Sequence, residues 1–170
     1  VEHEKLVEAA ERLLQGLDAG TPTLPQPANY HGGLSHSRKS FEQTHLVLAF
    51  ESLPFRHPDY YAAQLCAGAL GGGMSSRLFQ EVREKRGLCY AIYSFASGLS
   101  DSGMFAVYAA TSPDRADELL GVIHDELSRA ADTGFGEDEL ARVRAQVKMG
   151  LLAGLESSGS RGEKLARQIL

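Results

Sequence analysis

GGGMSSRLFQEVREKRGLCY, residues 71–90, is the stretch that decides the fold. It opens with three glycines, continues with a pattern typical of a short helix, and reaches Tyr90 at the start of a predicted strand. Ser75 or Ser76 is suited to begin the helix, because a serine hydroxyl can accept a hydrogen bond from a first-turn amide. Gly87 is suited to end it, because glycine readily takes the left-handed conformation found after helices.

The predicted helix has one apolar face. Met74, Leu78 and Val82 recur every four residues, which predicts that they are buried together. Arg83 falls at the edge of this stripe, beside Phe79 on its flank. An arginine at that edge can point toward something other than bulk water.

Each of these residues also has an ordinary interpretation. Arg83 alone is typical of a solvated helix arginine, and Tyr90 alone is typical of a half-buried strand tyrosine. The glycines Gly71, Gly72 and Gly73 do not make a phosphate-binding loop, because that motif needs a preceding strand and a following Lys-Ser/Thr pair. Here the glycines follow a helical pattern and lead into Met-Ser-Ser-Arg.

Taken together, the residues resemble a known family. The run LGGGMSSRLFQEVREKRGLCYAIYSF at 70–95 is similar to the C-terminal half-domain of the pitrilysin/insulinase/mitochondrial processing peptidase family of zinc metallopeptidases. The resemblance continues through residues 99–103, 111–120 and the run LLAGLESSGSRGEKLARQIL at 151–170. It extends from about residue 44 to the end, and more loosely from residue 1.

The resemblance implies that the peptidase is built from two halves with different functions. The N-terminal half holds zinc through an inverted His-x-x-Glu-His motif, and the C-terminal half closes over it to form a cleavage chamber. The spacing of Arg83 and Tyr90 matches the pair that the C-terminal half contributes. By resemblance, Tyr90 hydrogen-bonds the oxyanion, Arg83 holds the backbone of an extended peptide substrate, and Gly71, Gly72 and Gly73 contact substrate.

Composition excludes several classes of protein. The 170 residues are 43% hydrophobic, enough for a core, and a formal net charge of −5 argues against a nucleic-acid binder. No block of like charge suits a membrane surface, and no apolar run reaches spanning length. The chain starts without methionine or a signal peptide, so we expect a fragment or a processed chain. Its compartment stays open, with free thiols favouring a reducing one such as the cytoplasm.

We predict no metal site in this segment. The six histidines are His3, His31, His36, His45, His57 and His124. None pairs at helical spacing, and no His-x-x-Glu-His motif occurs, so the convergent ligands of a catalytic zinc are missing. Cys66 and Cys89 match no zinc ribbon or redox motif, which favours free buried thiols, although a single disulfide stays open. Zinc is expected only in the missing N-terminal half.

The part before residue 71 predicts two units. Residues 1–17 read as an amphipathic helix followed by a proline-rich linker, and the resemblance assigns 1–27 to the end of a preceding domain and 28–170 to the half-domain. Residues 28–33 are a weak first strand, and 35–43 a polar loop. Residues 45–51 alternate as a strand with one apolar face. A helix from Pro58 follows, with a predicted buried face made of Tyr61, Leu65 and Ala69.

After residue 90, apolar residues first recur at every second position, as in strands, and then recur at the spacing of helices. Residues 89–97 and 103–110 predict adjacent antiparallel strands. Ser112-Pro113 starts a helix whose predicted face is Ala116, Leu119, Leu120, Ile123, Leu127 and Ala130. A second helix begins at 137, with Leu140, Val143, Val147, Leu151 and Leu155 on one face. Gly159 is predicted to break it, with Ser160-x-x-Glu163 as the capping box of a final helix that we expect to be truncated at residue 170.

This order predicts an α+β fold: a two-layer domain with helices packed on one face of an antiparallel sheet. Three functions remain open. The chain is the non-zinc half of an active peptidase, or a degenerate family member or partner subunit that binds peptide or serves as scaffold, or an unrelated binding module. Arg83 and Tyr90 favour the first. Whether the zinc half lies in the same chain or another subunit, and whether a homodimer forms, stays open.

Overall fold

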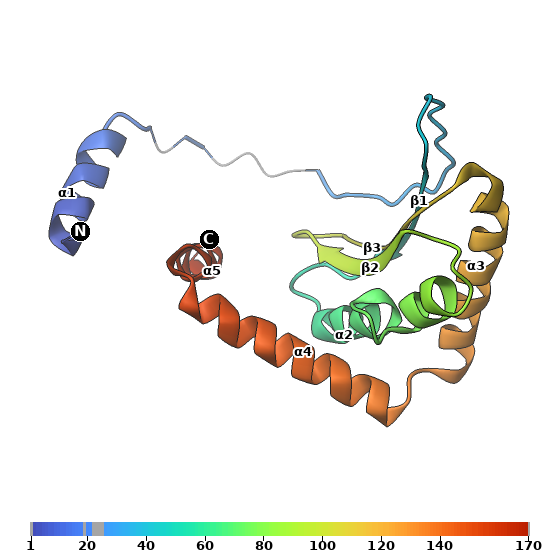
Figure 1. Ribbon diagram of the computed structural model, residues 1–170. Helices are drawn as coiled ribbons and strands as arrows, with labels where there is room; N and C mark the ends of the chain where they lie inside the picture. The colour runs from blue at the N-terminus through green and yellow to red at the C-terminus, as the bar shows by residue number, and fades with distance from the viewer. Residues whose placement is uncertain (1, 19, 22–25, 170) are drawn as a thin grey trace.

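The computed structural model describes residues 2–18, 20–21 and 26–169 (Figure 1). These residues form three strands, five α-helices and two short helical segments. Their bounds are α1 His3–Leu14, β1 Thr44–Ser52, α2 Tyr60–Gly71, η1 Phe79–Glu84, β2 Ala91–Gly98, β3 Gly103–Thr111, η2 Pro113–Arg115, α3 Ala116–Thr133, α4 Glu137–Glu156 and α5 Ser158–Ile169. From β1 onward, this is the predicted order of strands and helices.

The sheet is antiparallel, with β3 in the centre between β1 and β2. The hairpin from β2 to β3 closes where Gly98 pairs with Gly103, as the turn-forming residues between the two strands predict. In the register, Leu48 of β1 lies opposite Val107 of β3, and Ile92 of β2 lies opposite Ala109. These side chains share one face of the sheet, because residues on a strand alternate between faces.

The core lies between that face and the helices. Leu70 of α2, Leu78 and Val82 around η1, and Leu119 and Ile123 of α3 are buried in one cluster with Ile92, Val107 and Ala109 of the sheet. Figure 1 shows α2 and α3 on the same side of the sheet. The predicted two-layer α+β fold is therefore confirmed. Among the described residues no helix covers the opposite face of the sheet (Figure 1), which exposes Val47, Tyr93, Phe95 and Met104.

Three details before η1 differ from the sequence predictions. Residues 28–33 are not a strand, although Tyr30 donates a hydrogen bond to the Ala49 carbonyl of β1 at 3.2 Å. Tyr61 is 73% exposed, because α2 faces β2 through the side that carries Ala67 and Leu70. Met74 is also exposed, because the helix begins at Arg77 and leaves Met74 in the preceding loop.

The helix within the decisive stretch is wider than a regular α-helix. From Phe79 to Glu84 it is a π-helix, in which the Lys85 amide donates to the Gln80 carbonyl at 3.0 Å, five residues back. Gly87 follows with φ +59, as predicted for a glycine after a helix. Leu78 and Val82 are fully buried, so the predicted face is correct except at Met74.

The C-terminal helices correct two further predictions. The break after α4 falls at Ser157, whose backbone is extended, and not at Gly159, which lies inside α5. Ser157 is the residue that caps α5, because its hydroxyl oxygen accepts from the Ser160 amide at 3.3 Å. Glu163 instead accepts two hydrogen bonds from Arg167, so the predicted capping box does not form.

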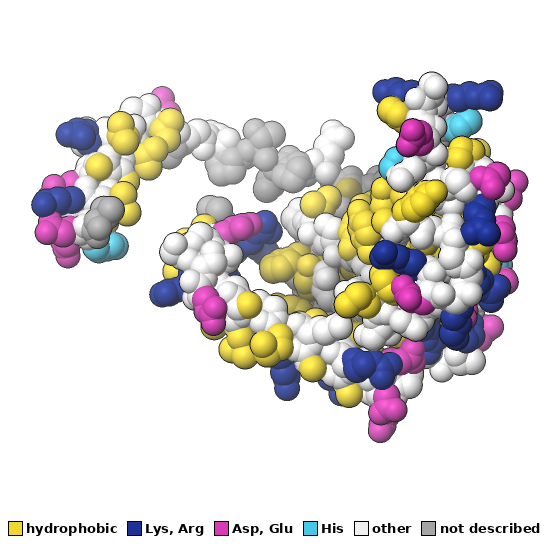
Figure 2. All heavy atoms as spheres, viewed as in Figure 1, with side chains coloured by type: hydrophobic (Ala, Val, Ile, Leu, Met, Phe, Trp, Pro, Cys, Tyr) yellow, Lys and Arg dark blue, Asp and Glu magenta, His cyan; other side chains and the backbone are white. Residues whose placement is uncertain are grey.

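Large apolar faces of the helices stay uncovered. Figure 1 shows α1 standing apart from the rest, and it buries no residue. On α4 only Val143 is buried, and Figure 2 shows hydrophobic side chains along the outer part of this helix. The exposed residues there are Val147, Met149, Leu151, Leu152 and Leu155. Pro22 and Pro25 of the predicted linker lie outside the described residues.

No helix among the described residues is both long enough and apolar enough to cross a membrane.

Candidate functional site

The glycine triplet joins α2 to the loop before η1. Gly71 is buried against β2: a Cβ there would lie 2.5 Å from the backbone nitrogen of Ser94. At Gly72 a Cβ would lie 2.6 Å from the Cα of Gly68, whereas at Gly73 it would approach only the Gln146 side chain at 3.5 Å. Close packing therefore accounts for the first two glycines, and contact of the triplet with substrate stays a prediction.

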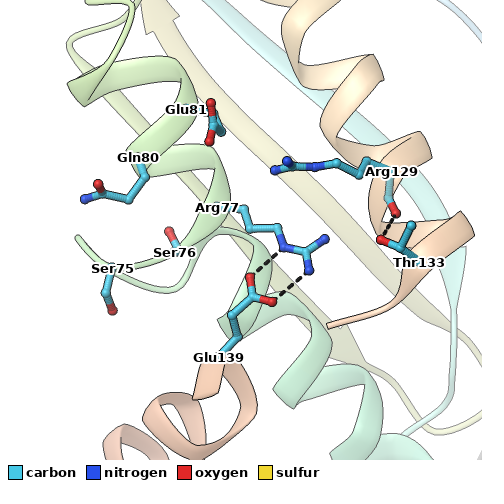
Figure 3. Close-up of a pocket in the computed structure, with 8 residues that line it drawn as sticks. All are labelled: Ser75, Ser76, Arg77, Gln80, Glu81, Arg129, Thr133 and Glu139. Atoms are coloured by element: carbon cyan, nitrogen blue, oxygen red, sulfur yellow. Dashed lines mark hydrogen bonds and ion pairs between the residues drawn. The ribbon is translucent and has the colours of Figure 1, made fainter. Parts of the chain in front are cut away.

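The start of the helix is held by Arg77. Its Nε and Nη2 donate to the two carboxylate oxygens of Glu139 in α4 at 2.6 and 2.7 Å (Figure 3). Nη2 also donates to the Gly134 carbonyl at 2.7 Å, and the guanidinium lies 4.6 Å from the centre of the Phe135 ring. One side chain thus joins the start of this helix to the corner between α3 and α4.

The electrostatics of this contact are strong. Hydrogen bonds from Arg77 lower the pKa of Glu139 from 4.5 to about 2, although partial burial opposes the shift. The same hydrogen bonds raise the pKa of Arg77. Both groups are therefore charged throughout the physiological range. Within the described residues, Nη1 of Arg77 is buried and has no hydrogen-bond partner.

The far end of the stretch is held as firmly. Arg115 donates to the Gly87 carbonyl at 2.6 Å, and the Thr111 hydroxyl donates to the Leu88 carbonyl. The Tyr90 amide donates to the Ala110 carbonyl of β3 at 2.8 Å. Tyr90 therefore lies one residue before β2, and its amide is hydrogen-bonded to the neighbouring strand β3.

The Tyr90 side chain is exposed to solvent. It is 60% exposed and lines a pocket of about 250 Å³ together with Gly87–Cys89, Thr111, Ser112, Asp114 and Arg115. Among the described residues, none hydrogen-bonds to its hydroxyl. A phenol in this setting is free to donate a hydrogen bond to a ligand.

Arg83 is exposed on η1, and its guanidinium lies 4.8 Å from the centre of the Phe79 ring. The predicted position beside Phe79 is therefore confirmed. Burial raises the pKa of the Cys89 thiol, and the positive charge of Arg83 opposes this shift, which places Arg83 near the segment that leads to Tyr90. The stretch thus presents two hydrogen-bond donors to solvent, the Arg83 guanidinium and the Tyr90 hydroxyl.

Metal ligands do not converge in the part of the chain that the structure describes. No three His, Cys, Asp or Glu residues there lie close enough to hold a metal ion. His45 shares a hydrogen bond with Tyr108 at 2.8 Å, and His57 accepts one from the Asp59 amide at 3.1 Å. These residues do not fit a catalytic zinc. The two cysteines are free, with Cys89 buried as predicted and Cys66 exposed, contrary to prediction.

Sequence reasoning missed Arg77. Nothing in the local pattern distinguishes it from other basic residues at 71–90, because its partner Glu139 is 62 positions away. The acidic first turn of the helix at residues 137–139 is not a signal for this pair, because the helix dipole alone favours acidic residues there.

Comparisons with known proteins agree on the kind of domain. The family of the peptidase M16 inactive domain matches residues 1–147. A Rickettsia felis protein named "Uncharacterized zinc protease" is 40% identical over 168 residues, which cover 98% of this chain and 40% of that protein. A Streptomyces coelicolor protein, also named an uncharacterized zinc protease, is 35% identical over 100% of this chain and 39% of its own length.

Solved structures agree with the fold. The peptidase M16 inactive domain from Pseudomonas fluorescens superposes with a TM-score of 0.74 at 28% identity, covering 87% of this chain and 37% of that one. A protease from Helicobacter pylori superposes with a TM-score of 0.81 at 22% identity, covering 99% of this chain and 43% of that one. This chain spans about 40% of the length of the curated relatives it matches.

Proposed function

Because this chain belongs to the family of the peptidase M16 inactive domain, we propose that it is the C-terminal, non-zinc-binding half of a zinc metalloendopeptidase. The single observation that carries this proposal is the pair Arg83 and Tyr90, both exposed on a stretch whose two ends are tied to the rest of the fold. A stretch fixed in this way can present donors to a substrate with little loss of conformational entropy on binding.

The chemistry of the two side chains suits peptide hydrolysis. Attack on a peptide carbonyl places negative charge on its oxygen, and a neutral phenol such as Tyr90 can donate a hydrogen bond to that oxygen. Loss of one such donor typically lowers the rate by about 10²–10³. The Arg83 guanidinium has five donors and suits the carbonyl groups of an extended peptide backbone.

Zinc, in this proposal, belongs to the other half and would supply the activated water there. That half completes the chamber, either within the same polypeptide or as another subunit, and a homodimer is one such arrangement. Residues 1–27 belong to the end of the preceding domain and residues 28–170 to this half. The lack of buried residues in α1 supports this boundary.

A second candidate is a catalytically inactive relative or a partner subunit that binds peptide or serves as scaffold. The helix-free face of the sheet favours a binding role, because it exposes Tyr93 and Phe95 side by side with ring centres 6.1 Å apart. In this case Arg83 and Tyr90 would hold a peptide without taking part in hydrolysis.

The experiment that separates these functions uses the full natural gene product. We expect one zinc per chain, or per pair of halves, and peptide hydrolysis that a chelator abolishes. Tyr90→Phe should lower turnover by about 10²-fold and leave zinc content unchanged, because only one donor is removed.

Hydrolysis at an unchanged rate in the Tyr90→Phe variant would remove this residue from the mechanism. A gene product with neither zinc nor hydrolysis would leave the binding or scaffold role.

A further inference from the structure

We infer that Arg77 is a positioning residue, whose clamp onto Glu139 and Gly134 fixes the helix that presents Arg83 and leads to Tyr90. This inference rests on the proposed function, because it assigns Arg77 a task in the same site. Arg77 itself does not touch the substrate in this assignment.

The clamp is specific in geometry. The guanidinium makes two hydrogen bonds to the Glu139 carboxylate (Figure 3). It also donates to the Gly134 carbonyl and lies over the Phe135 ring. Only the planar fork of arginine makes all of these contacts at once. A lysine keeps the charge but has neither the bidentate geometry nor the planar face that stacks.

The acceptors of the clamp are themselves held in place. Gly134 ends α3 with φ +67, a conformation that side-chain-bearing residues seldom adopt. Oε2 of Glu139 also accepts a hydrogen bond from the Gly136 amide at 2.8 Å, which fixes the carboxylate at the start of α4. The two residues that accept from Arg77 are thus each hydrogen-bonded within the connection between α3 and α4.

Arg77 is the first helical residue before η1, and the helix continues without a break to Glu84. Arg83 is on that same helix. A shift of the first turn would thus move the turn that carries Arg83, whereas Tyr90 is held to β3 by its own amide hydrogen bond.

Apolar packing does not hold this end of the helix alone. A pocket of about 360 Å³ flanks the clamp, and its lining is mostly polar: Ser75, Ser76, Arg77, Gln80, Glu81, Arg129, Thr133 and Glu139 (Figure 3). Leu78 and Val82 anchor the opposite side of the helix. The position of the helix on the pocket side therefore depends on the ion pair.

The test compares Arg77→Lys in the full natural gene product with a matched control, Arg167→Lys. Arg167 also pairs with a glutamate, Glu163, but on the exposed surface of the single helix α5. We expect Arg77→Lys to lower kcat by about tenfold, because small displacements of positioned groups are costly to rate, and Arg167→Lys to leave kcat unchanged.

A positioning role predicts a result that a purely structural one does not. In a background of Arg83→Gln and Tyr90→Phe, Arg77→Lys should lower kcat by less than about twofold, since the groups it positions have lost their function. The inference would be overturned if Arg77→Lys lowered kcat tenfold both in the natural protein and in the double variant. It would also be overturned if Arg77→Lys left the kcat of the natural protein unchanged. If Arg77→Lys does not fold, Glu139→Gln replaces it, because the glutamine oxygen can still accept from the Gly136 amide.

Hydrogen exchange tests the clamp without requiring that the protein hydrolyse peptides. The amides of Lys85 and Leu88, which donate within and just after η1, should exchange about tenfold faster in Arg77→Lys, while the β3 amides are unchanged. If Tyr90→Phe and Arg83→Gln both leave hydrolysis unchanged, the proposed function fails, and unchanged exchange at Lys85 and Leu88 then overturns the clamp as well.

Discussion

At the scale of single residues, the decisive stretch shows two kinds of constraint. Gly71 is required by close packing, because a side chain would collide with the backbone of β2 at Ser94. Arg83 and Tyr90 have no such packing requirement, since both side chains are exposed. A residue that is exposed on a rigidly held segment is free to contact a ligand.

Gly71→Ala should destabilise the domain by about 1–3 kcal/mol, because the contact is with backbone and cannot be relieved by a side-chain rotation. Urea unfolding of the full gene product measures this loss. The matched control is Gly121→Ala in α3, where a Cβ meets nothing within 4 Å. There we expect no loss, or a gain of about 0.5–1 kcal/mol from the higher helix propensity of alanine. Equal stability of the two variants would contradict the packing argument.

At the scale of elements, the contact between the helix start and the α3–α4 corner depends on one carboxylate. The Arg77 hydrogen bonds lower the Glu139 pKa to about 2. A group whose pKa is lowered on folding stabilises the fold above its unfolded pKa, and this contribution is lost as the pH falls toward the folded value. Acid should therefore weaken this contact before it affects the apolar core.

Glu139→Gln should be less stable than the natural protein by about 2 kcal/mol at pH 7, between the values for exposed and fully buried ion pairs. This difference should shrink as the pH falls from 4.5 to 2, because the natural carboxylate becomes protonated on unfolding and then in the folded state. Urea midpoints of both proteins at pH 7, 4.5 and 3 check it. Glu163→Gln, which loses only an exposed pair on α5, is the control. A difference that stays constant down to pH 3 would show that charge is unimportant at residue 139.

At the scale of the whole molecule, the domain buries apolar side chains on one face of its sheet and leaves others exposed elsewhere. The helix layer buries the inner face, whereas the outer face, the outer side of α4 and all of α1 expose apolar side chains (Figure 2). The chain spans about 40% of the length of its curated relatives. Its surface is therefore consistent with a unit that works together with further structure.

The two halves should differ in their affinity for zinc. Calorimetry of the 170-residue chain should show no tight one-to-one zinc binding, because no ligand group converges among the described residues. The full gene product should bind zinc tightly. Tight binding by the short chain would show that its histidines come together in solution.

The sequence by itself determined the order of strands and helices, the inner face of the sheet and the glycine after η1. Each of these follows from local patterns: alternation along strands, four-residue spacing along helices, and the backbone freedom of glycine. It also determined the spacing of Arg83 and Tyr90, which the resemblance marked as candidate site residues. That these two residues lie exposed on a segment held at both ends could not be read from their spacing.

Only the tertiary structure decided the rest. Met74 and Tyr61 fit apolar helix faces in the sequence but are exposed, because the start of one helix and the orientation of the other depend on packing against the sheet. Ser157 caps α5 in place of the predicted Ser160, because the end of α4 sets where the chain turns. Arg77 and Glu139 became visible as a pair only in three dimensions. Sequence patterns record a residue's neighbours within a few positions, whereas a contact across 62 positions exists only after folding brings its partners together.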